Sequence, residues 1–396
     1  MLNKPKYMKY TFIIFGLAEW DALLPTNQHH LARHLAERGH EVLFVDTVGT
    51  RRPRLGWADA GRVVRRLMGQ NKAPRQVEEG IWRISPLGPV PGIGAMQRKV
   101  LERRYASAVT KAIAQLGWPN PIGWFFNPRA AFLLGKIPLP MIVYHAVDDL
   151  RQIPGADITA IEEGEQHLAR AADLVLASAP PLYERLTAMA PGKTHLLPNV
   201  ADFEHFHAAA RDKPDAAIDS LPHPRIVFSG NLAASKIDVP LLLQLVRQRA
   251  DWHWVFIGLR WEGEVDEGLG QLSSLPNAHF IGHVAYKNLP RHFAGADAFI
   301  IPYASNELTA SVCPLKFFEY LATGKPVVAT PLPALLPFAN VVPLANNFET
   351  FVAALNDVLR HPEEKQAERL ALARSYTWDR RIEEIETLLE GLNKHP

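Results

Sequence analysis

The sequence predicts an α/β protein with two doubly wound domains built on mainly parallel sheets. The chain has 396 residues, which is more than one hydrophobic core usually organises. Short β-rich runs alternate with amphipathic helical stretches along the chain. Most of the β-rich runs are continuously apolar, as expected for parallel strands that are covered on both faces.

Strands are predicted wherever a short apolar run is bounded by turn residues. In the first half of the chain these runs are 11–16, 41–46, 121–126, 141–146, 174–178 and 194–198. In the second half they are 225–230, 254–258, 278–282, 298–303 and 326–331. Helical periodicity is found between and after them, for example at 31–38, 239–249, 347–360, 362–375 and 378–392.

The segment 202–224 interrupts this alternation because it is rich in Ala, Asp, His and Pro. We therefore predict a first domain at 1–201, a linker at 202–224 and a second domain at 225–375. A helical segment at 376–396 ends the chain.

Composition predicts a protein of the cytoplasm. Hydrophobic residues make up 47% and charged residues 21%, and the single cysteine, Cys313, rules out an intrachain disulfide. No apolar run reaches the roughly 20 residues that span a bilayer. Lysines precede the apolar run 10–18 as in a signal peptide, but Glu19, Trp20 and Asp21 follow without a cleavage site. We expect a buried first strand there.

The first part of the chain is basic, with 18 Lys and Arg against 9 Asp and Glu in residues 1–110. Region 51–75 alternates basic and apolar residues at near-helical spacing, and further basic residues follow at 98–104. A basic amphipathic helix is typical of a membrane-surface element that binds anionic lipid. The alternative is a solvated helix packed on its own domain. No nucleic-acid-binding motif is present.

The densest candidate site lies between 300 and 328. A strand ends near Tyr303, a polar loop contains Glu307, Thr309 and Ser311, and a helix begins near Pro314. A helix N-terminus suits a diphosphate, and Lys316 in the first turn is favourable only beside an anion. Glu319 lies on the same helical face, where its carboxylate could accept the ribose hydroxyls of a nucleotide. The alternative is a solvated Lys316–Glu319 pair.

This region resembles the donor-site helix of family 4-type GT-B glycosyltransferases. The matching residues are Pro314-Leu315-Lys316, Glu319-Tyr320-Leu321-Ala322 and Gly324-Lys325-Pro326-Val327-Val328. Upstream, Ser229-Gly230-Asn231-Leu232 and Lys236 resemble the loop whose arginine and lysine usually hold the donor diphosphate, with Asn231 at the arginine position. Residues 197–206 resemble the family's domain-junction motif, and 276–282 resemble the next strand.

The resemblance implies a GT-B fold, in which two Rossmann-like doubly wound domains face a central cleft. Domain 1–201 would bind the acceptor, domain 225–375 the nucleotide-sugar, and segment 376–396 would return to the N-terminal domain. Glu319 would hold the ribose, and Gly230, Asn231, Lys236 and Lys316 would contact the donor, together with Glu307, Thr309 and Ser311.

Ser311 stands where retaining members of the family carry the first of two glutamates, and Glu307 is four residues too early. The arrangement is closer to the xanthan-type membrane-associated glucuronosyltransferase, an inverting enzyme. An inverting transfer needs a general base, for which Asp148 or Asp149 is the candidate. Repulsion between them would raise one pKa. The alternatives are an N-capping Asp and, as a weaker base, His145.

The loop after the first strand, with Gly16, Glu19, Trp20 and Asp21, is the candidate acceptor site. Gly16 allows close approach of a ligand, the carboxylates can bind hydroxyls, and Trp20 can stack on a sugar ring. Packing within the loop is an equally good explanation of Trp20.

The sequence therefore predicts transfer of a sugar from a nucleoside diphosphate, with UDP favoured, to a glycan or lipid-linked acceptor. The protein would lie at the inner face of the membrane and serve exopolysaccharide or cell-surface glycan synthesis. No cofactor or metal is expected, since the 16 histidines are scattered and no Asp-x-Asp motif occurs. The alternatives are a sugar-nucleotide epimerase of the same fold and a non-catalytic nucleotide-sugar-binding subunit.

Overall fold

The structure is a computed structural model that describes residues 8–23, 25–47, 73–89, 93–153, 155–208, 213–259 and 266–393. It divides into two compact units, each with its own parallel sheet. Unit 1 comprises Met1–Leu197 and Glu386–Pro396, and unit 2 comprises Pro198–Ile385. Most of the basic region 51–75, namely residues 51–72, lies outside the described residues.

Unit 1 contains an eight-stranded sheet in the order β3-β4-β2-β1-β5-β6-β7-β8. Its strands are β1 (Thr11–Phe15), β2 (Glu41–Val45), β3 (Arg75–Glu78), β4 (Ile81–Ile84), β5 (Ile122–Phe125), β6 (Met141–Ala146), β7 (Leu174–Ala177) and β8 (Thr194–Leu196). All neighbouring strands are parallel except β3 and β4. The central strands are buried, which confirms the apolar runs as covered parallel strands.

The strands β3 and β4 were not predicted. Arg75, which the sequence pattern placed at the end of a basic helix, instead begins β3. The two strands are four residues each and form an antiparallel hairpin around Gly80, whose φ of 72° requires the left-handed region. Because β3 is mostly exposed and carries charged residues, its apolar periodicity is too weak to identify it.

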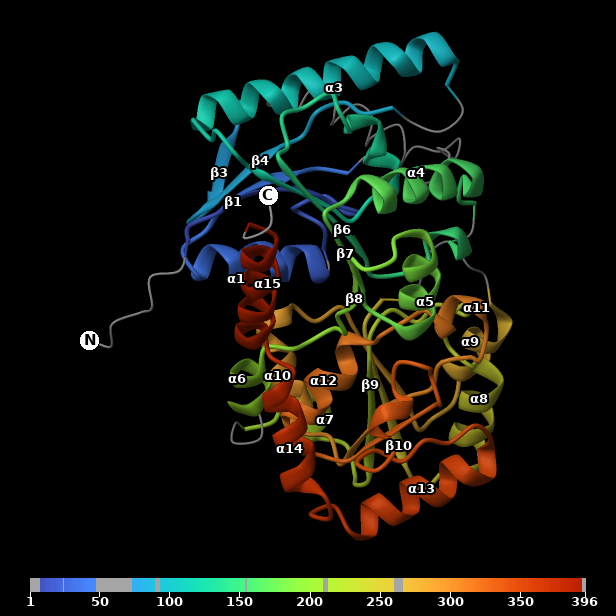
Figure 1. Ribbon diagram of the computed structural model, residues 1–396. Coiled ribbons are helices and arrows are strands. Elements are labelled where there is room, and N and C mark those ends of the chain that lie inside the picture. The colour runs from blue at the N-terminus through green and yellow to red at the C-terminus, as the bar shows by residue number, and fades with distance from the viewer. Residues whose placement is uncertain are drawn as a thin grey trace, which may run out of the picture. The chain divides into compact units, whose positions relative to one another are not determined.

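Helices cover both faces of this sheet. They are α1 (Asn27–Glu37), α3 (Ala95–Leu116), η1 (Pro128–Leu133), η2 (Leu150–Gln152), α4 (Ile158–Ala171) and α5 (Pro180–Met189). Figure 1 shows α3 and α1 on opposite sides of strands β1 to β4. Six residues of α1 are buried, five of them in the consecutive run 28–32, so the start of this helix is enclosed on all sides.

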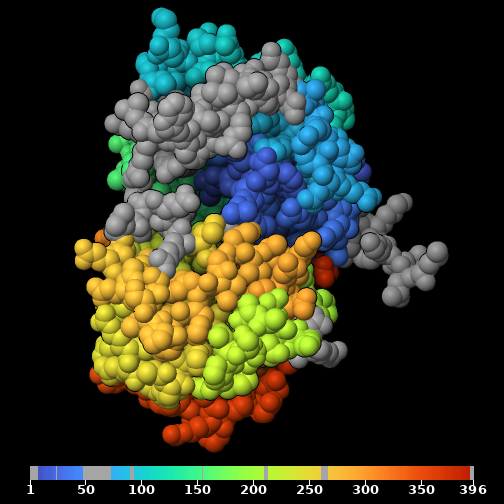
Figure 2. All heavy atoms as spheres, turned by 180° about the vertical axis from the view of Figure 1, so that it is seen from behind, coloured from blue at the N-terminus to red at the C-terminus, as the bar shows by residue number. Residues whose placement is uncertain are grey.

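Unit 2 contains a five-stranded parallel sheet in the order β11-β10-β9-β12-β13. The strands are β9 (Arg225–Ser229), β10 (His253–Ile257), β11 (Ala278–Gly282), β12 (Ala298–Ile301) and β13 (Val327–Ala329). The helices are α6 (Phe203–His207), α7 (Ala216–Asp219), α8 (Val239–Gln248), α9 (Glu267–Leu272), η4 (Tyr286–Asn288), α10 (Leu289–Ala294), α11 (Glu307–Ala310), α12 (Leu315–Ala322), η5 (Leu336–Phe338), α13 (Phe348–Arg360), α14 (Gln366–Ser375) and α15 (Trp378–Asn393). In the space-filling view, the yellow and orange segments of unit 2 form a continuous surface, with the orange-red α13 at its lower end (Figure 2).

The predicted linker 202–224 contains the short helices α6 and α7. Phe203 and Phe206 of α6 are buried, and Ile218 of α7 is fully buried, so this segment contributes to the packing of unit 2. At the other end of the chain, α15 begins in unit 2, and its residues from Glu386 belong to unit 1.

Glu386 explains why the end of α15 stays with unit 1. Its carboxylate accepts hydrogen bonds from Arg38 and lies 3.0 Å from the Nε2 of the buried His40. A buried carboxylate needs such partners, because removing an ion from water without compensation costs several kcal/mol. None of the described helices is both long enough and apolar enough to cross a membrane.

Candidate functional site

The site in unit 2 forms where the strand order reverses. From β9 the chain proceeds outward through β10 to β11, and then returns to the other side of β9 as β12. At such a switch point the loops after the two central strands diverge and leave a crevice at the carboxyl ends of the strands. The two loops are 230–238 after β9 and 302–314 after β12, the two segments in which the sequence predicts donor contacts.

Backbone and side-chain contacts hold these two loops together. Ile237 and Tyr303 form an isolated antiparallel bridge. The N–H of Ala304 donates to the carbonyl of Lys236 at 2.9 Å, and the Asn306 side chain donates to the carbonyl of Ser235 at 3.0 Å. The sequence motifs around Lys236 and around Glu307 are therefore parts of one structure.

Tyr320 anchors α12 to the end of β9. Its buried hydroxyl accepts a hydrogen bond from the Ser229 N–H at 2.7 Å and donates to the Ser229 carbonyl at 3.2 Å. The pairing of β12 with β9 extends only to Val227, so the hydroxyl satisfies backbone groups that lie beyond the last pair. The ring also stacks on Phe299 of β12, with centroids 4.2 Å apart. Burial raises the pKa of Tyr320 well above its usual range.

Two glycines, Gly230 after β9 and Gly258 after β10, allow the loops that follow these two strands to pass close to each other. The N–H of Gly230 donates to the carbonyl of Ile257 at 2.8 Å. A Cβ added to Gly258 would lie 2.0 Å from the carbonyl oxygen of Gly230, and Gly258 has a φ of 141°. Only glycine fits this position, because both the conformation and the space exclude a side chain.

Lys316 and Glu319 form an ion pair in the N-terminal half of α12, with Nζ and Oε2 2.8 Å apart. The side chain of Glu319 is 5% exposed and that of Lys316 is 23% exposed. The two side chains form the i, i+3 pair of that alternative, but Glu319 is buried and Lys316 is only partly exposed to solvent. The helix begins after Pro314, as predicted, and no side chain of the described residues caps its first turn. This combination is suited to an anion.

The other predicted donor residues differ in what they can offer. Asn231 and Lys236 are half-buried in the loop after β9, and Glu307 is exposed at the start of α11. Thr309 is fully buried, and its hydroxyl forms a capping box with Asn306 and donates to the Ala304 carbonyl. Its side chain therefore shapes the loop and is not open to a ligand. Ser311 is buried at the end of α11.

In unit 1, the loop after β1 is held by side chains from α1. Gln28 accepts a hydrogen bond from the N–H of Leu17, and a Cβ on Gly16 would lie 2.6 Å from its amide oxygen. The Nε2 of His29 lies 3.0 Å from the carbonyl of Glu19, and its Nδ1 accepts from the N–H of Thr26. Gly16 thus makes room for Gln28, a partner within the fold. Burial lowers the pKa of His29.

Trp20 and Asp21 are also engaged within unit 1. The Trp20 ring packs edge-on against Phe44 at 5.1 Å, and the Arg33 guanidinium lies 5.0 Å from its centroid. The Arg83 guanidinium donates hydrogen bonds to the carboxylate of Asp21 at 3.0 Å and to the carboxylate of the buried Asp46 at 2.7 Å. These contacts match the loop-packing explanation of Trp20, while the Asp21 carboxylate stays largely exposed.

Asp148 and Asp149 follow β6 and have different surroundings. Asp149 is buried, caps η2 and accepts hydrogen bonds from Arg151 at 2.8 and 2.6 Å. Burial by itself raises the pKa of Asp149, but the hydrogen bonds from Arg151 and the charge of Arg185 outweigh it and lower the pKa. A raised pKa is therefore not found at Asp149, for which the N-cap alternative applies. Asp148 is half-buried. The ring of His145 packs against the ring of Phe126, with ring centroids 4.9 Å apart.

The roles of several residues that organise these sites were not predicted from the sequence. Tyr320 could have been noticed as a polar tip in an apolar helix, but its partner is 91 residues away. Arg83 gave no signal, because its partner Asp46 is 37 residues away, and Arg151 was not considered although its partner Asp149 is only two residues away. Within the described ranges, no group of three or more His, Cys, Asp or Glu side chains could hold a metal ion.

Sequence comparison finds that this chain is similar to glycosyltransferases. Residues 223–361 match the family described as glycosyl transferases group 1. A protein of Bacillus subtilis (strain 168), provisionally named the teichuronic acid biosynthesis glycosyltransferase TuaH, is 29% identical over 247 residues. That match covers 59% of this chain and spans 61% of the relative's length.

The fold as a whole is similar to those of several solved structures. Sucrose-phosphate synthase from Thermosynechococcus elongatus aligns with 98% of this chain and 100% of its own at a TM-score of 0.70 and 17% identity. Anabaena HepE in complex with UDP-glucose aligns with 96% of this chain and 99% of its own, at a TM-score of 0.67 and 13% identity. At such identities the likeness shows the fold alone. Residues 223–361 are thus similar to the glycosyl transferases group 1 family, and the chain has the GT-B fold that its sequence predicts.

Proposed function

We propose that this protein is a glycosyltransferase that moves a sugar from a nucleoside-diphosphate donor, most simply a UDP-sugar, to a glycan or lipid-linked acceptor. The observation that carries the proposal is the first turn of α12, where the partly buried Lys316–Glu319 pair meets a helix N-terminus. Tyr320 ties this helix to β9, next to the loop that begins at Gly230. Ammonium, helix dipole and a nearby glycine loop are the features that bind a diphosphate.

The comparisons support the same chemistry. The match to the group 1 family covers 223–361 and so includes the α12 site, and the Bacillus subtilis relative is named for glycan biosynthesis. HepE was solved with UDP-glucose, and a trehalose-6-phosphate protein from E. coli, at a TM-score of 0.66, was bound with UDP-2-fluoro glucose. On the basis of these names, we propose that the donor nucleotide is UDP and that the product belongs to polysaccharide or cell-surface glycan synthesis.

In the proposed reaction, an acceptor hydroxyl oxygen forms a bond to the anomeric carbon while the bond from that carbon to the diphosphate oxygen breaks. The leaving diphosphate gains negative charge, which Lys316, Lys236 and the α12 N-terminus stabilise without a metal ion. Glu319 accepts hydrogen bonds from the ribose hydroxyls. Asn231 would contribute a neutral hydrogen bond to the phosphate where relatives use arginine.

The acceptor proton goes to a general base, for which we propose Asp148. Asp149 is neutralised by Arg151 and has a lowered pKa, so it is a poor proton acceptor and serves to position the loop. An inverting outcome follows from the proposal, since Ser311 at the end of α11 carries no carboxylate to assist on the donor side. The largely exposed Asp21 and the half-buried Glu19 would bind acceptor hydroxyls.

A lipid-linked acceptor would place the protein at the inner face of the membrane, bound as a peripheral protein through residues 98–104 and the basic region 51–75. Residues 98–104 lie on α3 and are mostly exposed, as such a role requires.

The test is a thermal-shift panel of nucleoside diphosphates and nucleotide-sugars, because a ligand that binds only the native state raises its melting temperature. UDP and a UDP-sugar should raise the melting temperature of the wild type. Lys316→Ala should abolish that rise, while Lys287→Ala, which removes an exposed lysine of η4, should leave it intact. A wild type that responds to no nucleotide would refute the proposal.

Product analysis separates the alternatives. An epimerase converts the donor without an acceptor, whereas the proposed enzyme releases UDP and a glycosylated product only when an acceptor is supplied. Asp148→Asn should abolish transfer with UDP binding retained. If Asp148→Asn transfers at the wild-type rate, Asp148 is not the base, and a wild type that binds UDP without turnover would favour the non-catalytic subunit.

A further inference from the structure

A groove runs along α3 on the side that faces the segment after β4. It has a volume of about 720 Å³ and lies within unit 1. One wall is a stripe of α3 that includes Leu101, Arg104, Ser107 and Lys111, spaced by three or four residues and therefore on one helical face. The other wall includes Ser85 and Leu87, directly after β4.

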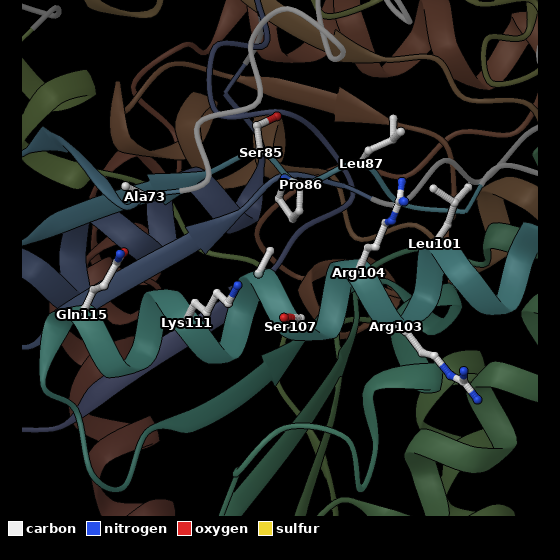
Figure 3. A pocket seen from close by; sticks show the side chains of 11 residues that line it. Ala73, Ser85, Pro86, Leu87, Leu101, Arg103, Arg104, Ser107, Lys111 and Gln115 are labelled. Carbon is white, nitrogen blue, oxygen red and sulfur yellow. The ribbon is translucent and has the colours of Figure 1, made fainter.

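Among the described residues, no acid balances the positive charge in this groove. Figure 3 shows Arg104 reaching toward the segment of Pro86 and Leu87, and Lys111 rising into the groove, and Arg103 is also among the residues that line it. The only acid on α3, Glu102, is engaged by Arg98 at 3.1 Å and Lys136 at 3.2 Å. In the described part of the chain, neither Arg104 nor Lys111 has an ion-pair partner or hydrogen-bond acceptor for its side chain, and no acid lines the groove. Cations gathered around a shared concavity favour an anionic ligand.

Apolar side chains continue the same stripe at the N-terminal end of α3. Met96 is 81% exposed and Val100 is 42% exposed. Met96 lies four residues before Val100, and Val100 lies four residues before Arg104, so the two side chains extend the stripe toward the start of α3. Exposed Met and Val beside uncompensated cations match an amphiphile, in which an apolar chain adjoins an anionic head. A soluble anion would use the cations and leave the apolar turns without a role.

We propose that this groove binds the phosphate of an anionic membrane lipid, with Arg104 and Lys111 on the headgroup and Met96 and Val100 in the interface. The inference deepens the proposed function, because it rests on a peripheral membrane location and names the surface and the lipid chemistry that create it. No covalent step is involved. Ser85 and Ser107 supply hydroxyl donors for the remaining phosphate oxygens.

The experiment is flotation of the full-length protein with phosphatidylcholine vesicles, with and without phosphatidylglycerol. Wild type should bind the vesicles that contain phosphatidylglycerol, and binding should weaken with added salt. Arg104→Ala with Lys111→Ala should lower the partition coefficient about 30-fold, from roughly 5-fold for each cation at an anionic surface. Met96→Ser with Val100→Ser should also lower it, with the salt dependence unchanged.

The matched control is Lys287→Ala with Arg291→Ala, which removes the same charge from exposed positions of η4 and α10. This variant should bind like the wild type. If the control loses as much vesicle binding as the groove variant, net charge alone drives binding, and the proposal of a lipid-binding groove is wrong. Unchanged binding by Arg104→Ala with Lys111→Ala would overturn it as well.

Two further measurements distinguish a failure of this inference from a failure of the proposed function. Inorganic phosphate is added in the thermal-shift assay: if it stabilises wild type but not the groove variant, and vesicles do not bind, the ligand is a soluble anion and the lipid proposal is wrong. The UDP-induced rise in melting temperature should be equal in wild type and in the groove variant. Its absence from both would refute the proposed donor site and would leave the vesicle result to be judged by itself.

Discussion

Replacing Tyr320 by phenylalanine tests whether the hydroxyl of this residue holds the donor site together. The substitution keeps the ring, and with it the stacking on Phe299, but removes the atom that both accepts from and donates to the Ser229 backbone. Ser229 is 3% exposed, so solvent cannot replace the lost partner without opening the fold. The variant should therefore lose stability and loosen the loop that starts at Gly230.

The magnitude follows from the two groups left without a partner. A buried N–H or C=O that loses its hydrogen bond costs about 1 to 3 kcal/mol. Two such groups give a loss of about 2 to 6 kcal/mol in the free energy of unfolding of unit 2. For a domain of this size, that corresponds to a fall in melting temperature of roughly 10 °C.

The assay is differential scanning calorimetry with and without UDP, and the control is Tyr376→Phe. The Tyr376 ring stacks on Phe318 of α12, the helix that carries Tyr320, with ring centroids 4.7 Å apart. No hydrogen bond of the Tyr376 hydroxyl is found among the described residues. The control should change the unfolding free energy by less than about 0.5 kcal/mol, as is usual away from buried networks. If Tyr320→Phe and Tyr376→Phe melt at the same temperature, the hydroxyl does not have the structural role described here.

Three further predictions concern single positions. Gly258→Ala should destabilise unit 2 by about 1 to 3 kcal/mol or more and weaken UDP binding, because its Cβ would meet the Gly230 carbonyl, whereas Gly270→Ala in the open surroundings of α9 should be neutral or stabilising in chemical denaturation. Burial lowers the folded-state pKa of His29 below its ordinary value of 6.5, so the unfolded chain binds more protons just below that pH. Stability is therefore full above pH 6.5 and falls as the pH drops toward the folded pKa. His29→Gln keeps a capping residue and should flatten this acid limb in denaturation curves measured across pH; an unchanged limb would assign it to other groups. Asp149→Asn should lower the melting temperature by weakening the pairing with Arg151, whereas Asp148→Asn should abolish transfer; if Asp149→Asn melts like the wild type, the pairing with Arg151 does not stabilise the fold.

Local patterns determined much of this protein. The continuous apolar runs predicted the core strands of both sheets, because a strand covered on both faces has no polar side. The proline and lysine at 314 and 316 located the start of α12, since helix-initiation preferences depend on nearby residues. The donor-loop motifs and their order resemble those of GT-B glycosyltransferases, and this resemblance predicted the GT-B fold. The hairpin β3–β4 was missed because four-residue strands with charged, exposed side chains carry too little periodicity.

The roles of individual side chains were decided by the tertiary structure. Asp148 and Asp149 are adjacent acids in the sequence, and only the placement of Arg151 and Arg185 makes Asp149 a buried, paired carboxylate. Thr309 turns inward to cap α11, although its position in a polar loop suggested a ligand contact.

Long-range contacts explain the difference between what could and could not be predicted. Propensity, capping and apolar periodicity act over a few residues, so the sequence by itself determined the elements and their order. The hydrogen bonds of Tyr320 to Ser229 and of Arg83 to Asp46 join residues 91 and 37 positions apart. Such partners meet only after the parallel sheets form, and the burial and charge of each site residue therefore depended on the tertiary structure.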